Sequence, residues 1–246
     1  MIRITNLSLT YGRRGQNIEA LRDINLSIQK GEFICLLGPS GCGKSSLLNL
    51  IGGFLNPTKG EIRINNLDMK RPNADIGMIF QKFSLFPWQT VAQNIAFGLR
   101  QKNLEREAVI GIVRSYLKKV DLIDFESAYP NELSGGMQQR VAIARSFAND
   151  PAILLMDEPF GSLDSQTKYQ MRSLLLDIWN VSRKTVVFVT HDIEEAIELS
   201  DRIIVISSRP GTIKYELSVE LPRPRNWDVL NSKEGLSVRE LLLSLL

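Results

Sequence analysis

Residues 33–51 decide the fold, and they read FICLLGPSGCGKSSLLNLI. The first five are all apolar, which is typical of a strand buried on both faces of a parallel sheet. The following glycines fit the pattern G-x-x-x-x-G-K-[ST], whose backbone N–H groups curl around phosphate oxygens at the start of a helix. This stretch therefore predicts a nucleotide-phosphate loop, made of Gly38, Pro39, Ser40, Gly41, Cys42, Gly43, Lys44, Ser45 and Ser46.

Two residues of the loop have predicted roles of their own. Lys44 should reach the β- and γ-phosphates, and the Ser45 hydroxyl should ligate Mg²⁺. A chance glycine-rich turn is the alternative, but an apolar strand precedes the loop and an apolar helix start follows it. Cys42 is interpreted as a small filler residue, with a redox role as the weaker alternative.

Three further apolar runs are followed at once by polar side chains. The runs are 76–80, 153–156 and 186–189. In open α/β sheets, ligands bind beyond the carboxyl ends of the strands. This rule indicates Gln81, Asp157, Glu158 and His191 as candidate site residues.

The two adjacent carboxylates should have different roles. Asp157 should hold Mg²⁺, as the Walker-B aspartate of P-loop ATPases does. Glu158 can face the water that attacks the γ-phosphate and act on it as a base. A solvated acidic turn is the alternative, which becomes a poor explanation beside a phosphate loop.

The rest of the chain predicts an α/β architecture with additions. Alternating apolar residues at 2–11, 24–28 and 62–64 indicate an N-terminal antiparallel sheet. Helical spacing predicts an inserted helical lobe at 91–149, where Ser134 could cap a helix. We expect core segments at 1–90 and 150–220 around this lobe, and a tail at 221–246 that ends in a short helix from Ser237.

Composition excludes several classes of protein. No basic segment followed by an apolar run is visible at the N-terminus, and no apolar stretch approaches the roughly 20 residues that span a bilayer. The net charge of +3 shows no dense basic stripe, so we expect no nucleic-acid partner. Two cysteines without a zinc-binding spacing indicate neither an oxidising compartment nor a zinc site.

A third motif gives a family resemblance. Residues 133–140, LSGGMQQR, resemble the signature motif of ATP-binding cassette (ABC) ATPases and precede the 153–156 strand at that family's spacing. The resemblance implies a P-loop NTPase (RecA-like) core and a dimer of two copies with ATP sandwiched between them. Each signature motif, here Ser134, Gly135, Gly136 and Gln138, then contacts the ATP bound by the other copy.

The resemblance assigns roles to further residues over 1 to about 220. Tyr11 resembles the aromatic that stacks on adenine, with a core aromatic as the alternative. Gln81 resembles the Q-loop glutamine that contacts Mg²⁺ or water and senses the membrane subunit. Residues 162–164 resemble the D-loop, although many relatives carry alanine where this chain has Ser162. His191, the only histidine, resembles the switch histidine that contacts the γ-phosphate.

The kind of cassette follows from what the chain lacks. It has one cassette, no fused membrane helices and no long insertion before the signature, which is similar to a bacterial importer subunit. The sequences FPW at 86–88 and SRPG at 208–211 resemble the nitrate, sulfonate, taurine and bicarbonate subfamily. That implies permease subunits in the membrane, a solute-binding protein and a place at the cytoplasmic face of the inner membrane. An ABC ATPase of DNA repair or translation is the alternative; a P-loop kinase explains neither the signature nor His191.

Overall fold

The computed structural model describes residues 1–13, 16–81 and 84–246, and it confirms the predicted α/β class. The chain divides into two compact units. The first, here the core unit, comprises 1–73 and 184–246; the second, the inserted unit, comprises 74–183. The segment boundaries inferred from the sequence at 90, 149 and 220 stay a prediction.

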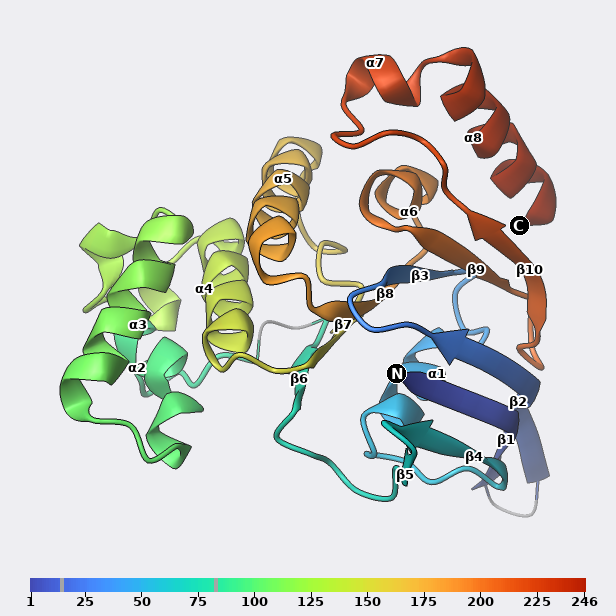
Figure 1. Cartoon of the computed structure of the whole chain (residues 1–246), viewed down its shortest axis with the longest axis horizontal. Coiled ribbons are helices and arrows are strands. Elements are labelled where there is room, and N and C mark those ends of the chain that lie inside the picture. Colours follow the sequence, from blue (N-terminus) through green and yellow to red (C-terminus); the bar gives the residue numbers. More distant parts are fainter. Residues whose placement is uncertain (14–15, 82–83) are drawn as a thin grey trace. The chain divides into compact units, whose positions relative to one another are not determined.

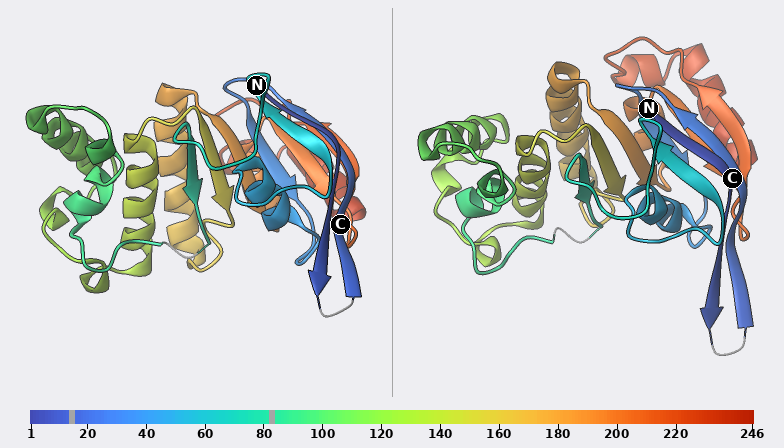
Figure 2. Two further views of the ribbon diagram at one scale, coloured as in Figure 1. Left: turned by 90° about the horizontal axis from the view of Figure 1, so that it is seen from below. Right: turned by 60° about the horizontal axis from the view of Figure 1, so that its bottom comes forward.

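The core unit contains the predicted antiparallel sheet. Its strand order is β2-β1-β4-β5, with β1 at Ile2–Arg13, β2 at Gln16–Ile28, β4 at Lys59–Ile64 and β5 at Leu67–Asp68. β1 and β2 run side by side as a long ribbon (Figure 2). Alternation places Ile2, Ile4 and Leu7 in the core. Pairing with β1 extends β2 well before the alternating residues at 24–28 that predicted it.

A second sheet of the core unit holds the phosphate loop. Its strands follow the order β10-β9-β3-β8, with β3 at Phe33–Leu37, β8 at Thr185–Thr190, β9 at Arg202–Ile206 and β10 at Ile213–Ser218 (Figure 1). β3 is parallel to both neighbours, β8 and β9, and all five of its residues are buried. Successive side chains point to opposite faces of the sheet, and both faces are covered here, which is why this run contains no polar residue.

Helices complete the core unit. They are α1 at Lys44–Ile51, α6 at Ile193–Leu199, α7 at Trp227–Leu230 and α8 at Lys233–Leu245. The C-terminal helix thus begins at Lys233, because Ser232 caps it, and not at the predicted Ser237. The arginines of the proline-rich link hold the tail to α6. Arg225 is 4% exposed and donates to four carbonyl oxygens, those of Ile197, Ser200, Val219 and Leu221.

The inserted unit combines two strands with helices. β6 at Ile76–Ile79 and β7 at Ile153–Asp157 are parallel neighbours. The helices are α2 at Val91–Ala96, α3 at Arg106–Lys119, α4 at Gly135–Ala148 and α5 at Ser165–Ser182. Short 3₁₀ turns lie at Leu99–Gln101, Ile123–Phe125 and Pro130–Glu132. α2, α3 and α4 pack on one another, so the predicted helical stretch is helical.

Two expectations about strands need correction. Phe80 does not continue the buried strand: β6 ends at Ile79, three of its four residues are half-buried, and Phe80 is 40% exposed. β9 and β10 had no counterpart in the sequence analysis, although β9 is buried at four of its five positions. Among the described residues, no helix combines the length and apolar character needed to cross a membrane.

Candidate functional site

The phosphate loop leaves the end of β3 and opens α1. Gly43 stands at the N-terminus of α1 with φ +106°, a conformation that side chains disfavour. A Cβ there would lie 2.7 Å from Leu21 Cδ2 and 3.0 Å from the Ala20 carbonyl oxygen. No side chain caps the amides of the first turn of α1. The loop therefore presents backbone N–H groups and the positive helix end, the donors that a phosphate requires.

Lys44 lies inside the loop. Its side chain is 3% exposed, and Nζ donates hydrogen bonds to the carbonyl oxygens of Gly38 at 2.7 Å and Pro39 at 3.0 Å. Cys42 Sγ is 3.9 Å from the same nitrogen, and Cys42 is 1% exposed, as a small filler residue would be. The ammonium group is thus held against the loop that would surround the phosphates.

The turn between β9 and β10 buttresses the phosphate loop. Arg209 Nη2 donates to the Gly41 carbonyl oxygen at 3.1 Å. Gly211 exchanges backbone hydrogen bonds with β2, and a Cβ on it would lie 2.2 Å from the Cys42 carbonyl oxygen. In the sequence alone, the SRPG segment at 208–211 indicates only a resemblance to one subfamily. Its packing against the loop could not be found from sequence, because the two segments lie far apart in the chain.

Tyr11 lies near the start of α1. Its hydroxyl group is 3.1 Å from Ser46 Oγ, and the side chain is 40% exposed. An exposed ring with a tethered hydroxyl can offer its face to a flat base. The alternative, a core aromatic, is wrong for Tyr11.

The register between β3 and β8 places His191 at the same sheet edge as the start of the phosphate loop. Leu37, the last residue of β3, is paired with Thr190, the last residue of β8. Gly38 and His191 therefore leave neighbouring parallel strands at the same edge, as the sequence analysis expected. His191 is exposed, and Asp192 after it caps α6 through the amides of Glu194 and Glu195.

The inserted unit places three candidate residues at its own strand ends. Ile79 of β6 is paired with Met156 of β7, so Gln81, Asp157 and Glu158 lie at the ends of neighbouring strands. Asp157 is the final residue of β7, whereas Glu158 adopts φ +44°. A glutamate in the left-handed region carries about 1–3 kcal/mol of strain, a feature that clusters at functional sites. That the two groups of strand ends act on one nucleotide stays a prediction.

The signature and D-loop residues line one cavity of the inserted unit, of about 490 Å³. Ser134 caps α4 by accepting from the Met137 amide at 3.3 Å, as predicted. Asp164 caps α5, and its hydrogen bonds with Thr167 lower the carboxyl pKa. Gln138 Nε2 donates to the carbonyl oxygens of Pro130 and Leu133, so this amide nitrogen is bound by the segment that leads into α4.

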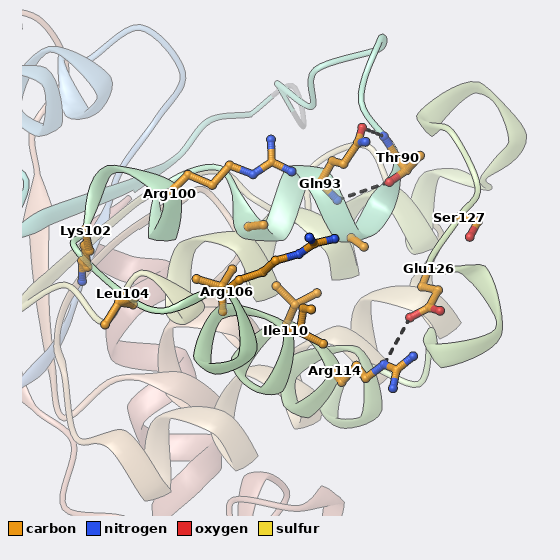
Figure 3. A pocket seen from close by; sticks show the side chains of 14 residues that line it. Thr90, Gln93, Arg100, Lys102, Leu104, Arg106, Ile110, Arg114, Glu126 and Ser127 are labelled. Carbon is orange, nitrogen blue, oxygen red and sulfur yellow. Dashed lines mark hydrogen bonds and ion pairs between the residues drawn. The ribbon is translucent and has the colours of Figure 1, made fainter.

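A second cavity of the inserted unit is a groove of about 740 Å³ between α2 and α3 (Figure 3). Its apolar floor comprises Ala92, Ala96, Val109, Ile110 and Val113, and its cationic rim comprises Arg100, Lys102, Arg106 and Arg114. Arg114 pairs with Glu126 at 3.7 Å, and Lys102 donates to the Asn149 carbonyl oxygen. Among the described residues, the guanidinium groups of Arg100 and Arg106 have no hydrogen-bond or ion-pair partner.

An aromatic patch precedes this groove in the chain. Trp88 is 71% exposed, and its ring centroid is 5.7 Å from that of Phe86, which lies 4.4 Å from Phe97. The fully buried Asn94 fixes the segment by bonding to the backbone of Phe86, Gln89 and Thr90. Phe83, which precedes this patch in the chain, lies outside the described residues.

The expected Mg²⁺ ligands offer suitable chemistry. Ser45, Gln81 and Asp157 carry a hydroxyl, an amide and a carboxylate oxygen, the ligands that this hard cation prefers. Among residues 1–13, 16–81 and 84–246, no cluster of three or more His, Cys, Asp or Glu side chains could hold a metal ion.

Comparisons with known proteins show the family of the chain. Residues 21–161 match the family model described as ABC transporter. The chain is 50% identical to the nitrate import ATP-binding protein NrtD of Synechocystis sp., over 90% of this chain and 83% of that protein. It is 43% identical to the aliphatic sulfonates import ATP-binding protein SsuB of Bacillus cereus, over 98% and 94%.

A solved structure is also similar. It is the dimeric structure of MJ0796, a bacterial ABC transporter cassette, with a TM-score of 0.79 and 38% identity over 89% of this chain and 99% of that chain. The same cassette has been solved as a dimer in a post-hydrolysis state bound to ADP and Pi, with a TM-score of 0.78.

Proposed function

The chain belongs to the ABC transporter family, and we propose on this premise that it is the ATP-binding and ATP-hydrolysing subunit of an importer. The observation that carries the proposal is the phosphate loop, with Gly43 in a conformation and a space that exclude a side chain and with Lys44 Nζ turned onto the loop. The reaction is ATP plus water to ADP plus phosphate.

We assign the residues of both units to one nucleotide by their chemistry. The amides of 41–46 and Lys44 neutralise phosphate charge, while Tyr11 stacks on the base. Glu158 accepts a proton from the attacking water or orients it. His191 donates a hydrogen bond to the γ-phosphate, where charge develops during hydrolysis. Ser45, Asp157 and Gln81 would hold Mg²⁺, which supplies positive charge between the β- and γ-phosphates.

The working form is proposed to be a dimer of two copies with two shared ATP sites. The related cassette MJ0796 was solved as a dimer. In this chain Ser134, Gly135 and Gly136 line a cavity of the inserted unit. A signature that serves the partner's ATP makes nucleotide part of the interface, and a ligand that binds only the pair stabilises the pair.

The groove of Figure 3 and the Trp88 patch are proposed as the docking surface for the permease subunits. An apolar floor with a cationic rim fits an amphipathic helix that carries acidic residues. Arg106→Glu should weaken co-purification with the permease at least tenfold because it reverses a rim charge without touching the phosphate loop. Lys118→Glu, exposed on α3 and outside the lining of both cavities, is the control. Equal loss for both variants would refute docking here.

The transported solute is proposed to be a small oxyanion of the nitrate or sulfonate type. Both relatives compared above carry such names, and the complex should work at the cytoplasmic face of a membrane with a solute-binding protein. Oxyanion-dependent stimulation of ATPase activity in vesicles containing the permease and binding protein tests this class. Stimulation by sugars or amino acids alone would contradict it.

The activity itself is tested on the purified chain. We expect ATP hydrolysis that requires Mg²⁺ and stops in EDTA. Absence of hydrolysis both alone and with the permease would refute the proposed function.

A further inference from the structure

A buried carboxylate, Glu195, lies behind the segment that carries His191. Glu195 belongs to α6 and is 3% exposed. Its Oε2 atom accepts a 2.6 Å hydrogen bond from the hydroxyl group of Thr190, which ends β8 and is 2% exposed. An O–H···O contact of this length is typical of an ionised acceptor. Burial of a carboxylate is costly, and none of the roles assigned above uses this one.

The same hydroxyl group also accepts a hydrogen bond. The Asp192 amide donates to Thr190 Oγ1 at 3.0 Å. Asp192 Oδ1 in turn accepts from the amides of Glu194 at 2.8 Å and Glu195 at 3.2 Å. These hydrogen bonds link Glu195 to Thr190, Thr190 to Asp192, and Asp192 back to Glu195. Thr190 and Asp192, the two residues that flank His191 in the chain, therefore both belong to this ring.

The ring fixes the backbone of an exposed residue. The His191 side chain is exposed, whereas Thr190 and Glu195 beneath it are buried. The Glu195 carboxylate fixes the direction of the Thr190 O–H bond, which leaves a lone pair aimed at the Asp192 amide. The peptide between His191 and Asp192 is thereby held, and with it the position from which the imidazole extends.

Glu195 also belongs to the surroundings of the phosphate loop. α6 packs against both β3 and β8. Burial raises the pKa of the Cys35 thiol well above its ordinary value, the Glu195 charge raises it further, and Lys44 opposes both. The charges of Glu195 and Lys44 thus both act on Cys35, which lies at the middle of β3, the strand that leads into the loop.

We propose that Glu195 is a positioning residue for His191 and that it acts through the Thr190 hydroxyl group. The proposal rests on the role assigned to His191 in the proposed function. Neither Glu195 nor Thr190 touches the nucleotide. They set where the imidazole stands at the carboxyl end of β8, beside Gly38.

The first experiment compares Thr190→Val with Thr190→Ser in steady-state ATPase assays. Valine keeps the shape but loses both hydrogen bonds, so kcat should fall about tenfold, the effect of one lost charge-assisted bond. The KM for ATP should stay within about twofold because phosphate binding depends on the loop. Serine keeps the hydroxyl group and should restore kcat. Equal kcat in the valine variant and the wild type would overturn the proposal.

The second experiment tests whether the effect passes through His191. Glu195→Ala and Thr190→Val are each combined with His191→Ala. Once the imidazole is gone, neither change should lower kcat further, whereas independent effects would multiply. A further loss of about tenfold in the double variants would overturn the proposal. His191→Ala with wild-type turnover would instead contradict the proposed function, which separates the two failures.

The third experiment needs no catalysis. His191 is the only histidine, so its imidazole protons give resonances that no other histidine overlaps. Thr190→Val and Glu195→Ala should shift and broaden these resonances, and Thr190→Ser should leave them in place. Unchanged imidazole resonances in folded valine and alanine variants would overturn the proposal.

Discussion

Gly211 should be intolerant of even one added carbon atom. A Cβ on Gly211 would lie 2.2 Å from the Cys42 carbonyl oxygen, and Ile206 Cγ2 and Leu21 Cδ2 would lie 3.1 Å away. The first contact is with the backbone of the phosphate loop, so no side-chain rotation can relieve it. We expect Gly211→Ala to cost about 3 kcal/mol, the upper part of the range for overpacking. In a chain of this size that lowers the Tm by about 6–12 °C.

The relief of this clash should displace the loop. We expect ATP affinity to fall at least about tenfold, because a shift at Cys42 moves the amides that bind phosphate. Thermal unfolding by circular dichroism and titration with a fluorescent ATP analogue give the two numbers.

A second glycine supplies the control. Gly111 lies on the exposed side of α3, and a Cβ there would have no atom within 4 Å. Gly111→Ala should raise stability by about 0.5–1 kcal/mol and leave ATP binding unchanged. A Gly211→Ala protein with wild-type Tm and ATP affinity would refute the packing argument.

The remaining predictions address other residues. Lys44→Ala should reduce ATP affinity at least about a hundredfold while the chain stays folded, as measured by nucleotide titration; normal binding would contradict its phosphate contact. Glu158→Gln should bind ATP, hydrolyse it at least about a hundredfold more slowly and accumulate as a dimer in light scattering with Mg-ATP. A monomer at saturating Mg-ATP would count against the shared sites. Arg225→Met should cost about 3–5 kcal/mol in denaturant unfolding, because four buried carbonyl oxygens lose their donor. A cost near zero would mean that water replaces the guanidinium group.

The sequence predicted the elements whose residue pattern is imposed locally. β3 could be predicted because an unbroken apolar run is typical of a strand that is buried on both faces, and α1 because the glycine-rich loop precedes an apolar turn. α4 could be predicted because Ser134, a preferred N-cap residue, precedes apolar residues at helical spacing. The residues at the strand ends followed from the same patterns, since parallel strands present their carboxyl ends at one edge.

What the sequence did not reveal depends on pairing between distant segments. The first half of β2 has only a short alternation at 17–20, and its strand conformation depends on pairing with β1. The contact of Gly211 with the phosphate loop joins segments about 170 residues apart, and no local pattern records it. The burial of Glu195 could not be predicted for a related reason. A glutamate on a short helix is usually exposed to solvent, and only the packing around Thr190 shows that this one is buried.

The discontinuity of the core unit has a consequence for biosynthesis. β3 leaves the ribosome early, yet its partner β8 follows about 150 residues later and β9 later still. At 5–20 residues per second, an apolar strand with two open edges waits for about 8–30 s. During that interval the whole inserted unit is made and can fold by itself. Nascent chains should therefore carry a chaperone-accessible strand beside an already folded insert, and slow translation after residue 183 should increase aggregation without changing the stability of the finished protein.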